Sequence, residues 1–162
     1  MVCRHNDELE ALVKEAKKVT DKGEVASYIP ALAKADQHDL SVAIYYSNNT
    51  CLSAGDVEKT FTLQSISKVL SLALVLMEYG KDRVFSYVGQ EPTGDPFNSI
   101  IKLETVNPSK PLNPMINAGA LVVTSLLKGQ TSKERLDYLL SFIRKLTNNQ
   151  GITYCRDVAE SE

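Results

Sequence analysis

A serine and a lysine three residues apart stand at the start of a long apolar helix, and this stretch constrains the fold most. Apolar residues recur at helical spacing from Ile66 to Met77, and Gly80 is placed to end the helix. Ser65 and Lys68 then share one helix face, one turn apart, so that the amine can reach the hydroxyl. The spacing predicts a core helix that carries a polar pair in its first turn.

The pair has the chemistry of a nucleophile and its base. Packing Lys68 beside an apolar helix should lower its pKa, because desolvation disfavours the charged form, and a neutral amine can take the Ser65 proton. Backbone N–H groups and the positive end of the helix dipole would face an oxyanion formed at Ser65. The structural alternative is a helix-capping serine followed by a solvated lysine.

The Ser-x-x-Lys pattern is weak by itself, because the chain contains it three times. Ser99 and Lys102 match it, as do Ser125 and Lys128. Only at Ser65 does the pattern open a long periodic helix. Ser125 falls late in an apolar run, where a serine more often bonds to the backbone. The surrounding sequence therefore favours Ser65.

The overall composition favours one soluble domain that acts on a small polar ligand. The chain has 162 residues, 43% of them hydrophobic, and a formal charge of -2 with scattered basic residues, so no stripe for nucleic acid is present. Its longest apolar run, 69–77, is far shorter than the roughly 20 residues that cross a bilayer, and residues 1–6 do not resemble a signal peptide. We expect no nucleic-acid or membrane partner.

The three cysteines, Cys3, Cys51 and Cys155, are odd in number and widely spaced, with no Cys-x-x-Cys. This pattern predicts neither a disulfide framework nor a zinc site. It favours a reduced, cytoplasmic protein without a bound metal.

One hairpin and several helices are predicted. Residues 40–46 alternate as in a half-buried strand, Asn48-Asn49 forms a turn, and 50–53 return. Two strands alone are marginally stable, so the hairpin should belong to a larger sheet. A capping box at Thr131 to Glu134 starts the clearest helix. Further helices are predicted at 9–16, after a cap at Asn6 or Asp7, and at 31–34, 82–88 and 121–127. For 121–127 a strand is the alternative. A short element is predicted at 99–103, and a polar helix is predicted to begin near the chain end.

Six stretches, in order, resemble the serine-dependent glutaminases, which are similar in fold to β-lactamases and penicillin-binding proteins. The resemblance runs from about Gly23 to the end of the chain. The matching stretches are Tyr28-Ile29-Pro30, Ser53-Ala54-Gly55-Asp56, Gln64-Ser65-Ile66-Ser67-Lys68, Val88-Gly89-Gln90-Glu91-Pro92-Thr93-Gly94, Phe97-Asn98-Ser99 and Asn113-Pro114-Met115-Ile116-Asn117-Ala118-Gly119-Ala120.

The resemblance implies an α+β fold of the β-lactamase/transpeptidase type, with a helical cluster and part of an antiparallel sheet. Residues 1–22 would be an N-terminal helical segment, and 23–162 the N-terminal portion of a glutaminase catalytic domain. The family's domain is close to twice this size, so we expect its C-terminal half to be absent and this portion alone to be inactive. Family members are commonly dimers or tetramers, which implies a homo-oligomer.

The implied reaction is hydrolysis of L-glutamine to L-glutamate and ammonia, without a cofactor. Ser65 would attack the side-chain amide, Lys68 would act as base, and a γ-glutamyl ester would form. The alternatives are an inactive interaction piece and another Ser-x-x-Lys hydrolase of the penicillin-recognising group.

Three further residues would bind the substrate. In the family, the tyrosine matching Tyr28 lines the site, the asparagine matching Asn117 contacts the substrate, and the glutamate matching Glu162 binds its α-amino group. Glu160 is one alignment step from Glu162 and is the alternative. A core role for Tyr28 and a capping role for Asn117 are the structural alternatives.

Overall fold

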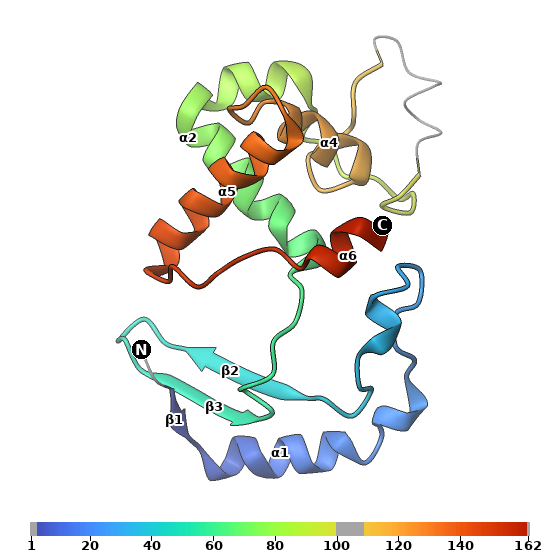
Figure 1. Cartoon of the computed structure of the whole chain (residues 1–162), viewed down its shortest axis with the longest axis vertical. Helices are drawn as coiled ribbons and strands as arrows, with labels where there is room; N and C mark the ends of the chain where they lie inside the picture. Colours follow the sequence, from blue (N-terminus) through green and yellow to red (C-terminus); the bar gives the residue numbers. More distant parts are fainter. Residues whose placement is uncertain (1–2, 100–108, 162) are drawn as a thin grey trace. The chain divides into compact units, whose positions relative to one another are not determined.

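The structure is a computed structural model that describes residues 3–99 and 109–161 (Figure 1). The chain divides into two compact units. One, the sheet unit, takes residues up to 62 and those from 154 onward. The other, the helical unit, takes residues 63–153. Most of the short element predicted at 99–103, and Glu162, lie outside the described residues.

The predicted hairpin is present in the sheet unit. Strands β2 (Ser41–Tyr45) and β3 (Cys51–Gly55) pair antiparallel, and Asn49 in the turn between them adopts a φ of 65°. A third strand, β1 (Arg4–His5), pairs parallel with β3 and gives the order β1-β3-β2. The sequence did not indicate β1, because two residues are too few to show an alternating pattern.

The prediction that the first strand is half-buried is wrong. Four of the five β2 residues are exposed, and only Val42 is partly covered. Helix α1 (Asp7–Lys17) packs chiefly against β3, the central strand, which carries the buried Cys51 and Ala54. As predicted, α1 is capped by Asn6, whose side chain accepts a hydrogen bond from the Leu9 N–H at 2.9 Å.

A disulfide joins Cys3 to Cys51, so the prediction of no disulfide is wrong. The cause is the pairing of β1 with β3, which places Arg4 opposite Leu52 and so brings the two preceding cysteines together. Their Cα atoms lie 4.5 Å apart, within the range that a disulfide spans. Cys155 is free and exposed.

The remaining elements of the sheet unit are short. The helix predicted at 31–34 is a single 3₁₀ turn, η2 (Leu32–Lys34), and the polar segment predicted near the chain end is helix α6 (Arg156–Ser161). A further 3₁₀ turn, η1 (Thr20–Lys22), follows α1.

The helical unit is built on α2 (Ser67–Tyr87), preceded by the 3₁₀ turn η3 (Gln64–Ile66). Gly80 interrupts α2 with a φ of 73° and a ψ of 163°, a conformation open to glycine, so the predicted helix end and second short helix are both present. The core of this unit lies where α2 meets the later helices. Its buried residues are Leu74, Val75, Val84, Val88, Val123 and Leu127.

Two further helices complete this unit. The stretch whose β-branched residues left a strand possible is helix α4 (Asn117–Ser125), and α5 (Ser132–Thr147) starts at the predicted capping box. Figure 1 shows α4 and α5 beside α2, in agreement with their contacts. Among the described residues, no helix has both the length and the apolar character needed to cross a membrane.

Candidate active site

Ser65 lies in the 3₁₀ turn η3, directly before α2, and its side chain is exposed. The sequence predicted that the α-helix starts at Ser65, but in the structure it begins at Ser67. The backbone turns at Gln64, which adopts a left-handed φ of 47°. Such a conformation in a residue other than glycine costs on the order of 1–3 kcal/mol and is enriched at functional sites. The strained residue presents Ser65 directly before the start of α2.

Lys68 extends from the first turn of α2 to the start of α4. Its Nζ donates hydrogen bonds to the Met115 carbonyl at 3.0 Å and to Asn117 Oδ1 at 2.6 Å. It also lies 5.5 Å from the centre of the Phe97 ring. Partial burial lowers the pKa of the Lys68 amine below its ordinary value, in the direction predicted from the sequence.

These two hydrogen bonds suit a lysine that works as a base. An ammonium group has three N–H donors, whereas a neutral amine has two donors and a lone pair. With Met115 and Asn117 taking two donors, one position on the nitrogen is left for a proton from a hydroxyl. In the part of the chain that the structure describes, the Ser65 hydroxyl is not a hydrogen-bond partner of this amine.

Asn117 reaches Lys68 because it is the first residue of α4. Its side chain bonds to the lysine and does not cap the helix, whose N-cap residue is Ile116. Its backbone N–H donates to the Phe97 carbonyl at 2.9 Å, which joins the loop before α4 to the loop around residue 97. The structure thus brings Ser65, Lys68 and Asn117 into one unit.

Two contacts of the Lys68 amine could not be predicted from residue types alone. Met115 contributes only its carbonyl, which no residue-type pattern can reveal. Phe97 belongs to one of the stretches that resemble the glutaminases, so an aromatic residue there was the available signal. Within the described ranges, no group of three or more His, Cys, Asp and Glu side chains could hold a metal ion.

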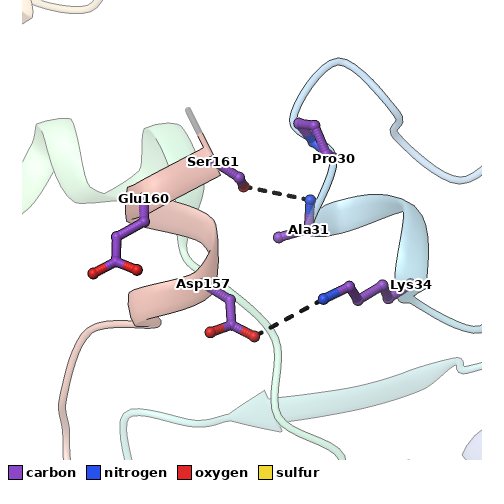
Figure 2. Close-up of a pocket in the computed structure, with 6 residues that line it drawn as sticks. All are labelled: Pro30, Ala31, Lys34, Asp157, Glu160 and Ser161. Atoms are coloured by element: carbon purple, nitrogen blue, oxygen red, sulfur yellow. Dashed lines mark hydrogen bonds and ion pairs between the residues drawn. The ribbon is translucent and has the colours of Figure 1, made fainter.

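Two other predicted substrate residues lie in the sheet unit. Tyr28 is 74% exposed and precedes the buried Ile29. Two residues further along the chain, Pro30 begins the lining of a pocket of about 310 Å³, shown in Figure 2. The pocket lining combines a cation, two carboxylates and a hydroxyl, and consists of Pro30, Ala31, Lys34, Asp157, Glu160 and Ser161.

Glu160 lines this pocket, and Figure 2 shows its carboxylate pointing away from Lys34. It pairs instead with Arg156 at 2.6 Å, while Asp157 lies 3.9 Å from the Lys34 amine. The Ser161 hydroxyl accepts a hydrogen bond from the Ala31 N–H at 3.4 Å. Glu160 therefore has a salt-bridge partner on its own helix, and its role in substrate binding stays a prediction.

A serine-dependent amide hydrolase uses a serine at a helix start as nucleophile and a lysine amine of lowered pKa as base. Here the side-chain amide of Asn117 also accepts a hydrogen bond from that amine. Comparison with known proteins agrees with this class. The family model described as Glutaminase matches residues 23–162, and the chain belongs to that family.

Two relatives with high identity extend well beyond the residues matched here. The chain is 93% identical to Glutaminase 2 of Bacillus subtilis (strain 168) and 62% identical to the glutaminase of Shouchella clausii (strain KSM-K16). Each alignment covers all of this chain and 52% of the relative. The chain therefore spans about half the length of the curated relatives it matches.

Solved structures agree on the fold. A crystal structure of Mglu in its glutamate form matches with a TM-score of 0.84 and 38% identity, over 96% of this chain and 35% of that one. The probable glutaminase from Bacillus subtilis complexed with 6-diazo-5-oxo-L-norleucine matches with a TM-score of 0.78 and 32% identity, over 100% and 48%. The predicted α+β, β-lactamase-like fold is confirmed as part of a domain.

Proposed function

We propose that the protein containing this chain hydrolyses L-glutamine to L-glutamate and ammonia, with Ser65 as nucleophile and Lys68 as base. The observation that carries the proposal is the Lys68 amine, held by two acceptors one helical turn after Ser65. Membership of the glutaminase family and relatives named glutaminase support the choice of substrate.

The reaction follows from these groups. The Ser65 oxygen attacks the side-chain amide carbon of glutamine while its proton passes to Lys68. Lys68 then gives that proton to the leaving nitrogen, the C–N bond breaks, and ammonia departs from a γ-glutamyl ester. Lys68 next takes a proton from water, which attacks the ester, and the serine leaves with that proton. N–H groups at the helix start favour the oxyanion in both steps.

Recognition of a free amino acid requires groups for its ammonium and carboxylate. We assign the α-amino group to Glu162, with Glu160 as the alternative, and assign substrate contacts to Asn117 and Tyr28. A carboxylate suits an ammonium, and an amide can bond to either end of the substrate. Binding both ends would fix the side-chain amide at the serine, which reduces the entropic part of the barrier.

The test replaces Ser65 and Lys68 in a protein continued to the length of the curated relatives. Ser65→Ala and Lys68→Ala should each reduce ammonia release from L-glutamine by about 10³-fold or more, with an unchanged melting temperature. Ser125→Ala is the matched control, because Ser125 belongs to another Ser-x-x-Lys pattern and its hydroxyl bonds to the Val122 carbonyl. Substantial turnover by either site variant would refute the assigned roles.

A second comparison concerns length. We propose that residues 23–162 form the N-terminal portion of a glutaminase catalytic domain and that residues 1–22 form a helical segment before it. The 162-residue chain should then release no ammonia, while the longer protein should do so. Activity of the shorter chain would contradict the proposal that these residues are only a portion of the catalytic domain.

Assembly and location are proposals as well. We propose a homo-oligomer, a dimer or tetramer, which light scattering of the longer protein tests.

A cytoplasmic location is tested by alkylating thiols in freshly lysed cells. The Cys3–Cys51 disulfide bears on this result, because structural disulfides are rare in the cytoplasm. A fully oxidised pair would argue against a cytoplasmic protein.

A further inference from the structure

We propose that Asn113 is a positioning residue of the Ser-Lys site, which fixes the loop that presents the Met115 carbonyl and the Asn117 amide to Lys68. This role rests on the proposed function, because it concerns the amine that serves as base. Asn113 itself does not contact Lys68 through any hydrogen bond in the described ranges. Its effect would pass through the backbone of the loop.

The orientation of one peptide group carries the argument. Asn113 Oδ1 accepts hydrogen bonds from the N–H groups of Met115 at 3.0 Å and Ile116 at 3.1 Å. The Ile116 N–H and the Met115 carbonyl belong to the same planar trans peptide, so they point in opposite directions. Holding the N–H on Asn113 therefore turns the carbonyl outward, where Lys68 Nζ donates to it at 3.0 Å.

The other end of the Asn113 side chain ties this loop to the rest of the unit. Its Nδ2 donates to the Glu91 carbonyl at 2.9 Å. The two segments also pair through their backbones. The Gly89 N–H donates to the Pro111 carbonyl at 2.7 Å, and the Glu91 N–H donates to the Leu112 carbonyl at 2.9 Å. Asn113 is thus fixed on one side while it orients the peptide on the other.

Close packing at the start of α4 completes the arrangement. A Cβ atom at Gly119 would collide with the Asn113 carbonyl, so the loop lies directly against the helix. The helix starts with the Ala120 N–H donating to the Ile116 carbonyl at 2.9 Å. Met115 and Asn117, the two acceptors for the amine, therefore belong to one rigid piece whose orientation depends on Asn113.

The test is Asn113→Ala in the protein continued to the length of the curated relatives. Without the side chain, the 115–116 peptide can rotate and the amine loses its fixed direction, so kcat should fall about 10- to 100-fold, with a smaller change in KM. Asn149→Ala is the matched control, because Asn149 Oδ1 also accepts from a backbone N–H two residues ahead, that of Gly151 at 2.9 Å. The control should keep the wild-type kcat.

Asn113→Asp separates the two halves of the side chain. The carboxylate keeps the two acceptor bonds to Met115 and Ile116 but loses the donor to Glu91. Its kcat should lie between those of the wild type and Asn113→Ala, and at least threefold below the wild type. Measuring kcat across pH separates a loss of the plateau rate from a shifted titration of Lys68 by the new charge.

A folded Asn113→Ala with kcat within twofold of the wild type, or with its whole loss in KM, overturns the positioning role. If Asn113→Ala does not fold, Asn113→Asp decides: a wild-type kcat overturns the role and a threefold loss supports it. Ser65→Ala is measured in parallel, because an active Ser65→Ala would refute the proposed function itself.

Discussion

The sheet unit and the helical unit are stabilised in different ways. In the helical unit, four valines are completely or almost completely buried, and Leu74 and Leu127 extend the same core. In the sheet unit the described residues bury few apolar side chains, namely Val13, Ile29, Cys51 and Ala54. A disulfide and specific polar contacts take over part of that role.

Two carboxylates illustrate the polar contacts of the sheet unit. Asp56 pairs with Lys17 of α1 and also accepts a hydrogen bond from the Leu40 N–H at 2.8 Å. Glu10 accepts a hydrogen bond from the Gly55 N–H at 3.1 Å. The comparison indicates why the serine and lysine are on the other unit: a base whose amine must keep one direction needs a densely packed support.

The largest expected effect is on the covalent link of the sheet unit. Cys3→Ser opens a loop with a sequence separation of 48 residues, and in the chain-entropy model its loss costs about 4 kcal/mol of unfolding free energy. Urea denaturation measures the loss, and hydrogen exchange should locate it in β2 and β3. Cys155→Ser, at an exposed free cysteine, should have no effect. Equal stability of the two variants would remove the disulfide from the comparison.

The next effect belongs to the helical unit. Leu74→Ala leaves a cavity in its core and should cost about 3 kcal/mol. Hydrogen exchange should then increase in 63–153 more than in the sheet unit. Leu121→Ala is the control, because Leu121 is 72% exposed. If the two leucine variants lost the same stability, the core would not be the main support of this unit.

A smaller effect is expected at the capping box of α5. Thr131→Ala removes the hydroxyl that accepts the Glu134 N–H at 3.2 Å, and should cost about 1 kcal/mol. Thr131→Ser keeps the acceptor and should retain most of the stability, which thermal unfolding can measure. A serine variant as unstable as the alanine variant would show that the cap does not contribute through this bond.

The smallest effect is the pH dependence of the sheet unit. The hydrogen bond from Lys17, and then that from the Leu40 N–H, lower the pKa of Asp56 from its ordinary 3.8. A lowered pKa in the folded state means that the stability is present above 3.8 and is lost as the pH falls through the folded value. Acid titration of the unfolding free energy should show a shallower loss in Asp56→Asn. An unchanged slope would remove this pair from the comparison.

Sequence periodicity predicted most of the helices, including the break at Gly80, because apolar spacing reports directly on burial. It could not predict the disulfide, since Cys3 meets Cys51 only through a two-residue parallel strand. The exposure of β2 was also missed, because alternation shows which side chains share a face and not whether another element covers that face.

At the site, the spacing at a helix start predicted Ser65 and Lys68, the resemblance added Asn117, and the geometry showed what joins Lys68 to Asn117. Glu91 and Asn113 stand in separate stretches that each resemble the family, and the structure links them by one hydrogen bond. In the sequence, Asn113 stands in one of these stretches directly before a proline, a pair typical of turns, and nothing there indicates a role for its side chain. A turn-forming residue and a positioning residue have the same sequence pattern, so only the partners of its side chain distinguish them.

The contact between Met115 and Lys68 has a consequence for mutational tolerance. Because the lysine bonds to a carbonyl, any side chain compatible with the local backbone could replace methionine there and leave the contact intact. A scan of single substitutions would then score position 115 as permissive although its backbone belongs to the site. Proline at the next position would remove the Ile116 N–H from Asn113, and it is there that the scan should find intolerance.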